Sequence, residues 1–268
     1  VLDCGNGASS DVASTVFTRL GAEVVALHVT PDGSNINDAS GSTHPESLRT
    51  AVVAEGAQLG FAFDGDADRM LAVDHQGRLI DGDQLIAVAA VDLKRRGLLV
   101  NDTVVVTVMS NLGFRIGMAA EGIEVVDTAV GDRYVLEALD QGGHVLGGEQ
   151  SGHIIFRDRA TTGDGVLSAV VIAEIVARTG RPLADLADAA MTRLPQVLRN
   201  VRIEAPMPDV TVRIADELTA AAAALGADGR VLVRPSGTEP VVRVMVEAVD
   251  AVTAQEWCDH LVQVVESL

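Results

Sequence analysis

The segment that most constrains the fold is an apolar run that ends in three alternating aspartates. Residues 59 to 63 read Leu-Gly-Phe-Ala-Phe, and Asp64, Asp66 and Asp68 follow directly, with only glycine and alanine between them. A short apolar run of this kind predicts a buried strand, and open α/β sheets bind their ligands at the carboxyl ends of such strands. The sequence therefore predicts an α/β fold with a group of carboxylates at one sheet edge.

The three carboxylates favour a metal site. At alternate positions they repel one another by about 1 kcal/mol per pair even in water. A hard divalent cation removes this repulsion, and Mg²⁺ prefers oxygen ligands while it keeps positions open for phosphate oxygens. We therefore predict that Asp64, Asp66 and Asp68 hold Mg²⁺, with Arg69 next to them in the sequence.

Alternating aspartates also occur in EF-hands, in phosphatases and in solvated turns. An EF-hand loop requires glycine at its sixth position and glutamate at its twelfth, where this chain has Arg69 and His75, so it is excluded. A phosphatase that uses Asp64 as a covalent nucleophile stays open as an alternative. A solvated acidic turn is disfavoured, because such turns seldom follow a buried strand so regularly.

Composition limits the partners of the chain. Its 268 residues, 48% of them hydrophobic, are enough for two or three domains with their own cores. The formal net charge of −18 argues against nucleic acid and anionic membranes, since both attract basic surfaces. No apolar run has the length of a membrane span, and no signal-peptide pattern is present. Cys4 and Cys258, far apart in the chain, favour a reduced cytoplasmic protein over a disulfide framework.

The pattern of apolar residues predicts three domains. Residues 1–77 and 78–192 each alternate strands with helices, whereas residues 193–268 contain longer strands. We therefore predict two consecutive three-layer α/β domains with mostly parallel mixed sheets, followed by a small α+β domain. The clearest elements are strands over 59–63, 103–108, 124–128, 197–204, 230–234 and 241–248, and helices over 83–96, 164–179, 209–225 and from Thr253, with Glu256 as its capping-box partner, to the end.

A loop between two of the predicted strands is suited to an oxyanion. It reads Arg-Pro-Ser-Gly-Thr-Glu-Pro over residues 234–240. Arg234 provides a planar guanidinium group, Ser236 and Thr238 provide hydroxyls, and Gly237 lets the backbone approach a ligand. An ordinary hairpin turn is the alternative, but it requires neither the arginine nor the paired hydroxyls. Arg243, in the following strand, is a second candidate cation.

Two further loops contain polar side chains that suit a sugar. Glu149 and Ser151 alternate, so a carboxylate and a hydroxyl lie on one side of an extended segment. His153 follows, although a buried histidine with a structural role is commoner than a catalyst. The pair Asp132 and Arg133 opens a predicted helix, where charge pairing at the helix start is the simpler interpretation. A metal site, a phosphate site and a sugar loop together indicate a phosphosugar enzyme.

Three motifs in this order resemble the α-D-phosphohexomutase superfamily: Asp-Gly-Asp-Ala-Asp-Arg at 64–69, Gly-Glu-Gln-Ser-Gly-His at 148–153, and the loop at 234–240. The resemblance covers essentially the whole chain, and the stretches at 31–37 and 131–135 are most similar to the bacterial branch that acts on glucosamine phosphates. It implies interconversion of glucosamine 6-phosphate and glucosamine 1-phosphate, through a phosphoserine and a bisphosphate, for UDP-N-acetylglucosamine and peptidoglycan synthesis. A phosphoglucomutase or phosphomannomutase of the superfamily and a non-catalytic phosphosugar-binding protein are the alternatives.

The resemblance also implies roles for single residues. Mg²⁺ would be the cofactor, and glucosamine 1,6-bisphosphate or glucose 1,6-bisphosphate the activator. Arg69, near the phosphoserine phosphate, and Asp132 and Arg133, which contact substrate and handle protons, would be catalytic. Substrate binding is expected for Glu149, Ser151, His153, Arg234, Ser236, Gly237, Thr238 and Arg243.

One part of the family pattern has no counterpart in this chain. The family's phosphoserine lies in a Ser-His-Asn-Pro-like loop of a first domain, and the nearest stretch here, residues 42–45, lacks the Ser-His pair. The chain also begins with Val1 inside a predicted strand. We therefore expect the phosphoserine domain to precede Val1 in the native protein, and this chain alone to be inactive as a mutase. The resemblance is compatible with a homo-oligomer.

Overall fold

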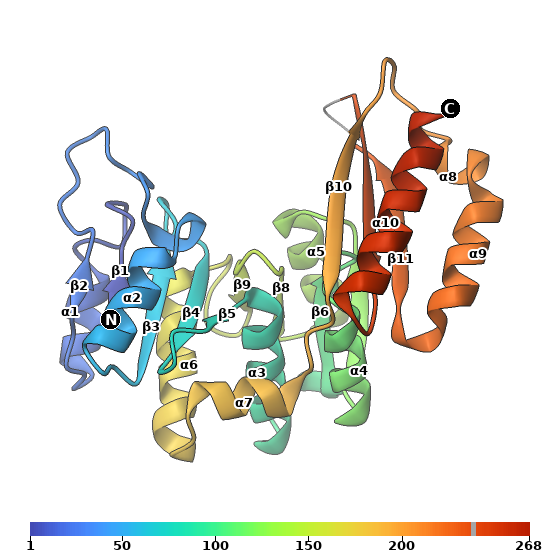
Figure 1. The fold of residues 1–268 in the computed structure, drawn as a ribbon. Coiled ribbons are helices and arrows are strands. Elements are labelled where there is room, and N and C mark those ends of the chain that lie inside the picture. Colours follow the sequence, from blue (N-terminus) through green and yellow to red (C-terminus); the bar gives the residue numbers. More distant parts are fainter. Residues whose placement is uncertain (237–239) are drawn as a thin grey trace. The chain divides into compact units, whose positions relative to one another are not determined.

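The computed structural model describes residues 1–236 and 240–268 (Figure 1). These residues form two compact units. The first unit contains Val1–Ser110 and Phe114–Thr192, and the second contains Asn111–Gly113 and Arg193–Leu268. Helices and mixed sheets are present in the first unit, and helices and an antiparallel sheet in the second. The predicted succession of α/β and α+β folds is confirmed.

The first sheet of the first unit has the strand order β2-β1-β3-β4-β5. Its strands β1 (Leu2–Asp3), β2 (Ala26–Leu27) and β3 (Leu59–Phe63) are parallel, and β4 (Met70–Asp74) and β5 (Leu79–Ile80) continue it in antiparallel fashion. The helices in this part of the chain are α1 (Ala13–Arg19), η1 (Gly41–Thr43) and α2 (Glu46–Ala54). Strand β3 has the predicted bounds and is buried along most of its length.

The second sheet of the first unit has the order β7-β6-β8-β9. Its strands β6 (Thr103–Thr107), β7 (Glu124–Thr128) and β8 (Leu146–Gly148) are parallel, and β9 (Ile154–Phe156) is antiparallel to β8. The helices in this part are α3 (Gly82–Arg95), η2 (Val100–Asp102), α4 (Leu112–Ala120), α5 (Asp132–Gly142), α6 (Gly165–Thr179) and α7 (Leu183–Ala190). Asp81 caps α3 by accepting a hydrogen bond from the Gln84 N–H group.

A single core cluster joins the two sheets of the first unit. It contains Phe61 and Met70 from the first sheet, Val106 from the second, and Ile86 and Ile172 from helices α3 and α6. Helix α3 is buried along nearly its whole length, which explains why its sequence is so rich in alanine, valine and leucine. Residues on both sides of the boundary predicted between residues 77 and 78 contribute to this one core. The three-domain division stays a prediction.

The second unit is a three-stranded antiparallel sheet with helices on one face. The order is β10-β12-β11, with β10 (Gln196–Arg202), β11 (Arg230–Pro235) and β12 (Val241–Glu247). The helices are α8 (Val210–Arg213), α9 (Ala215–Leu225), η3 (Gly226–Asp228) and α10 (Ala251–Glu266). The predicted helix over 209–225 is divided at Ile214, and α10 is capped by Asp250, which accepts the Thr253 N–H group, instead of by Thr253.

Two expectations drawn from composition can be compared with this fold. Cys4 and Cys258 are both free and buried, in agreement with the prediction that they form no disulfide framework. In residues 1–236 and 240–268, no helix combines the length and the apolar character needed to cross a membrane.

Candidate functional site

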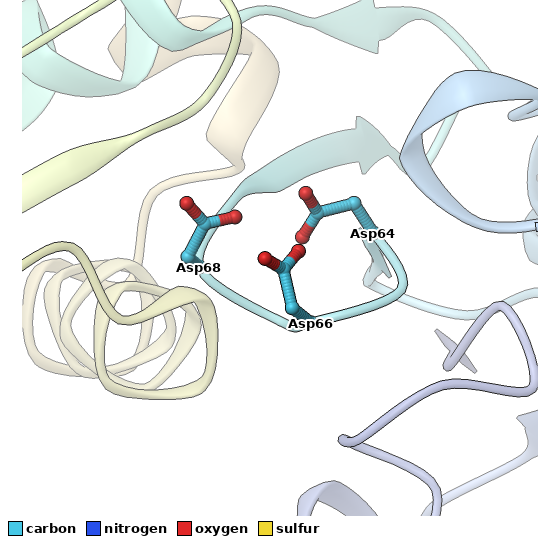
Figure 2. Close-up of side chains that lie close together, drawn as sticks. All are labelled: Asp64, Asp66 and Asp68. Carbon is cyan, nitrogen blue, oxygen red and sulfur yellow. The ribbon is translucent and has the colours of Figure 1, made fainter. Parts of the chain in front are cut away.

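The predicted metal ligands lie together in a hairpin loop. Residues 64–69 join β3 to the antiparallel strand β4, whose first pair is Phe63 with Met70. Figure 2 shows the three carboxylates turned toward one another, and one ligand oxygen from each lies within 4.8 Å of the others. Ala67, with a φ of 61°, adopts the left-handed conformation that curls the loop. The structure therefore brings Asp64, Asp66 and Asp68 together as the sequence predicted.

Burial and mutual repulsion perturb these carboxylates. Burial, with smaller contributions from Asp68 and Asp66, raises the pKa of Asp64 to about 6, although the Arg69 N–H group donates to Asp64 Oδ1 over 3.1 Å and opposes the shift. Burial also pushes the pKa of Asp68 upward, but the interactions with Asp64, His153 and Arg69 outweigh it and lower that pKa. A hard cation would relieve the repulsion and displace the proton, so this donor set fits Mg²⁺.

Arg69 lies at the edge of the metal loop. Its side chain is about half exposed, and its Nε atom lies 3.9 Å from Asp64 Oδ2 and 4.0 Å from Asp68 Oδ1. These distances are too long for hydrogen bonds, so the guanidinium group keeps its donors available to a further anion. The predicted contact of Arg69 with a phosphate is compatible with this position.

The metal loop is joined to a second hairpin loop, residues 149–153, which connects β8 to β9. The Met70 N–H group donates to the Gly152 carbonyl over 3.0 Å, and His153 Nδ1 lies 3.0 Å from Asp68 Oδ2. At the start of α6, the Gly165 N–H group donates to the Ala67 carbonyl over 2.9 Å. Two segments that lie far from the metal loop in the sequence therefore determine its shape.

The predicted sugar-binding residues lie in this second loop. Ser151 Oγ donates to Glu149 Oε2 over 3.4 Å, which places the two side chains on one side of the loop as the spacing predicted. Glu149 Oε1 accepts the Gly131 N–H group over 2.9 Å. Gly131 directly precedes α5, so this bond holds the loop of Asp132 and Arg133 against the loop of Glu149.

Asp132 and Arg133 form the first turn of α5 and are both exposed. Asp132 Oδ1 accepts the Arg133 N–H group over 2.8 Å, and Arg133 Nε pairs with Glu137 Oε1 over 2.7 Å. An ion pair four residues apart on a helix surface stabilises the helix only slightly. Their side chains are therefore available to a substrate, while their catalytic role stays a prediction.

The second unit contains a pair of arginines on neighbouring strands. Arg234 of β11 and Arg243 of β12 are register partners, so their side chains leave the same face of the sheet. Burial and the charge of Arg243 lower the pKa of Arg234. Like charges directly opposite each other destabilise a sheet, and an anion between them would remove the repulsion. This pair is therefore suited to phosphate.

The remaining residues of the predicted phosphate loop are only partly described. The Ser236 N–H group donates to the Val241 carbonyl over 2.8 Å and extends the pairing of β11 and β12 toward the turn. Gly237 and Thr238 lie outside the described residues.

In the hairpin that carries the metal loop, β3 is predicted from the sequence and its partner β4 is not. Strand β4 has a signal, since Met70–Asp74 is an apolar run that directly follows the metal loop. The contact of His153 with Asp68 has none, because 85 residues separate them. The hydrogen bond from the Gly131 N–H group to Glu149 has no local signal either, because it depends on the pairing of β6 with both β7 and β8.

Family models match the chain over nearly its full length. Residues 1–77 match the phosphoglucomutase/phosphomannomutase alpha/beta/alpha domain II, residues 81–194 match domain III, and residues 184–264 match the C-terminal domain. The chain therefore belongs to the phosphoglucomutase/phosphomannomutase family, and the resemblance inferred from the three motifs is confirmed.

Similar proteins include phosphoglucosamine mutases from two bacteria. The one from Frankia alni is 56% identical over 268 residues, an alignment that covers 100% of this chain and 59% of the relative. The one from Carboxydothermus hydrogenoformans is 52% identical over 272 residues, and that alignment covers 100% of this chain and 60% of the relative. The chain thus spans about three fifths of the length of these curated relatives.

Solved structures support the same fold. A phosphoglucomutase/phosphomannomutase family protein from Burkholderia thailandensis matches 99% of this chain and 59% of its own, with a TM-score of 0.81 and 28% identity. The N-acetylphosphoglucosamine mutase of Aspergillus fumigatus, solved with GlcNAc-6P and magnesium, also has a TM-score of 0.81, covering 98% of this chain and 65% of its own. At 21% identity this second likeness concerns the fold alone.

Proposed function

We propose that this chain supplies the metal, sugar and phosphate sites of a phosphoglucosamine mutase, which interconverts glucosamine 6-phosphate and glucosamine 1-phosphate. The observation that carries the proposal is the convergence of Asp64, Asp66 and Asp68 in a loop bonded to the loop of Glu149 and Ser151. Identity of 52–56% to the two phosphoglucosamine mutases above supports this substrate over other phosphosugars.

Phosphoryl transfer depends mainly on positioning and on neutralisation of charge. Asp64, Asp66 and Asp68 would hold Mg²⁺, which when bound would neutralise the oxygens of a transferring phosphoryl group. Arg69 would bind the same phosphate from the edge of the loop. Asp132 and Arg133 would contact the substrate beside this site and assist the movement of its protons.

The remaining residues orient the substrate. Glu149 would accept hydrogen bonds from the sugar hydroxyls, and Ser151 would donate or accept one. Arg234, Arg243 and Ser236, with Gly237 and Thr238, would bind the phosphate that does not react, because paired guanidinium groups match two edges of a phosphate.

The phosphoryl donor is proposed to lie in the part of the family's length that this chain does not match. That part would carry the phosphoserine, and glucosamine 1,6-bisphosphate or glucose 1,6-bisphosphate would act as the activator. We expect the chain alone, given glucose 1,6-bisphosphate, to convert no glucosamine 6-phosphate. Turnover at a rate typical of the mutases would contradict this division of roles.

Calorimetric titration of two variants tests the separate sites. Asp66 is the exposed member of the triad, so Asp66→Asn should weaken Mn²⁺ binding at least about tenfold while glucosamine 6-phosphate still binds. Arg234→Gln should have the opposite pattern, with about a tenfold loss of glucosamine 6-phosphate affinity and unchanged Mn²⁺ binding. The proposal fails if Asp66→Asn binds Mn²⁺ as tightly as the parent.

A phosphoglucomutase or phosphomannomutase is the second candidate, because the matching family models describe both activities. Titration with the 6-phosphates of glucosamine, glucose and mannose distinguishes them, and we expect the first to bind most tightly. Equal binding of all three would favour the second candidate. Family membership favours either mutase over an aspartyl phosphatase, for which Asp64→Asn would abolish hydrolysis of p-nitrophenyl phosphate.

A further inference from the structure

We propose that Tyr134 binds the sugar ring of the substrate, with its aromatic face packed against the C–H groups of the pyranose. The inference rests on the proposed function in one respect, namely that the loop of Glu149 and Ser151 binds a phosphosugar. It adds an apolar contact to a site whose other proposed contacts are charged groups and hydroxyls.

Tyr134 differs from the other aromatic residues of the chain in its exposure. The five phenylalanines are all buried, and Trp257 packs against the core of the second unit, whereas Tyr134 is 49% exposed. Single exposed apolar side chains are common on protein surfaces, so exposure alone does not indicate a site. What matters is where the ring lies.

The topology of the second sheet places Tyr134 next to the predicted sugar loop. Strands β7 and β8 both pair in parallel with β6, so their carboxyl ends lie at one edge of the sheet, where such folds bind ligands. Gly131 follows β7, Glu149 follows β8, and the Gly131 N–H group donates to Glu149 Oε1 over 2.9 Å. The Tyr134 N–H group donates to the Gly131 carbonyl over 3.0 Å, so Tyr134 lies one helical turn from this bond.

The ring of Tyr134 lies over Gly131. Side chains on a helix lean toward its N-terminus, and Tyr134 belongs to the first turn of α5. A Cβ atom added to Gly131 would lie 3.4 Å from Tyr134 Cδ2 and 3.7 Å from Cε2, which is van der Waals contact. The tyrosine ring and the Glu149 carboxylate therefore meet at the same glycine.

This arrangement matches the two kinds of surface that a pyranose presents. Its hydroxyls form a polar edge, which suits the Glu149 carboxylate, and its C–H groups form apolar faces, which suit the negative face of an aromatic ring. Sites for small molecules typically combine apolar or aromatic walls with a few polar groups that fix the orientation. Tyrosine also loses little conformational freedom on binding, because it has few rotatable bonds.

The chain contains a single tyrosine, so labelling with fluorotyrosine gives one fluorine resonance that belongs to Tyr134. We expect glucosamine 6-phosphate to shift this resonance and the shift to saturate with the dissociation constant that calorimetry gives. Inorganic phosphate, which has no sugar ring, should leave the resonance in place. An equal shift with inorganic phosphate, or no shift with bound glucosamine 6-phosphate, would overturn the contact.

Two substitutions separate the ring from the hydroxyl. Tyr134→Phe keeps the ring and should bind glucosamine 6-phosphate as the parent does, whereas Tyr134→Ala should bind it about 3-fold to 10-fold more weakly. Leu98→Ala is the matched control, because Leu98 is 46% exposed and follows the C-terminal end of α3, whereas the N-terminal end of α3 bonds to the sugar loop through Gly82 and Gln150. This control should match the parent.

The outcomes separate this inference from the proposed function. If glucosamine 6-phosphate does not bind the parent, the proposed function is wrong and the inference with it. If it binds the parent and Tyr134→Ala equally well, only the sugar contact of Tyr134 is overturned. Binding by Tyr134→Phe as weak as by Tyr134→Ala would overturn the contact through the ring face as well. A merely structural role predicts lower thermal stability of Tyr134→Ala with unchanged affinity, and the fluorine titration decides the question even if that variant unfolds.

Discussion

The metal loop and the arginine pair gather charges of one sign in two different ways. Asp64, Asp66 and Asp68 converge because their loop is bonded to segments from other parts of the chain, such as Gly152 and Gly165. Arg234 and Arg243 converge because the register of β11 and β12 makes them partners. A site can therefore be built by tertiary packing or by strand pairing alone, and the first route depends on many more residues.

In both regions the surroundings disfavour the charged form of one side chain. The pKa of Asp64 is raised and that of Arg234 is lowered, in each case by burial first and by a neighbouring like charge second. Each shift favours the neutral form of the group, whereas a bound ligand of opposite charge would favour the charged form. Perturbed pKa values of this kind are common at functional sites.

The largest expected effect comes from a substitution that disrupts the tertiary contacts of the metal loop. Gly152 has a φ of 93°, and an added Cβ would lie 2.3 Å from the Met70 carbonyl oxygen, so Gly152→Ala should lower the free energy of unfolding by roughly 3 kcal/mol. Gly180, with a φ of 63° and no atom within 4 Å, is the control, and Gly180→Ala should cost about 1 kcal/mol. Urea unfolding measures the free energy of unfolding of both variants. Equal losses in the two would show that the close approach of Gly152 to Met70 does not contribute to stability.

A smaller effect concerns pH and the buried carboxylate. The folded protein binds the Asp64 proton more tightly than the unfolded chain, since the pKa is about 6 when folded against an ordinary 3.8. The stabilisation by this proton is complete below pH 3.8 and is lost as the pH rises through about 6. Over that range the metal-free parent should lose about 1 to 3 kcal/mol relative to Asp64→Asn, which does not titrate.

Thermal unfolding at pH 4.5 and pH 7, with and without Mg²⁺, sharpens the same point, with both pH values chosen to bracket a pKa of about 6. Mg²⁺ should stabilise the parent more at the higher pH, because the cation then has no proton to displace. A constant stability difference between the parent and Asp64→Asn across these pH values would mean that burial leaves the carboxyl unperturbed.

The smallest expected effect concerns the arginine pair. Because strand pairing alone brings Arg234 and Arg243 together, Arg234→Gln should leave the fold intact and change the free energy of unfolding by at most about 0.5 kcal/mol without ligand. The comparison with the metal loop would break down if Arg234→Gln destabilised the protein by as much as Gly152→Ala. Urea unfolding of the phosphate-free variant provides the value.

Much of the fold and of the site chemistry could be predicted from local sequence. Strand β3 and strand β7 have the predicted bounds, because runs of alternating or continuous apolar residues are a local signal. The cap of α10 was placed at Thr253 instead of Asp250, since Asp250 and Thr253 each match the pattern of a cap and only the backbone conformation decides between them.

The sequence by itself determined the chemistry of the sites: three carboxylates after a buried strand, a carboxylate and a hydroxyl at alternate positions, and two arginines flanking a turn. Only the tertiary structure decided that the first two lie in adjacent hairpin loops and that His153 bonds to Asp68. The physical reason is range. Residue type and spacing act within a few positions, whereas the bond from His153 to Asp68 spans 85 residues and exists only once both sheets are packed on one core.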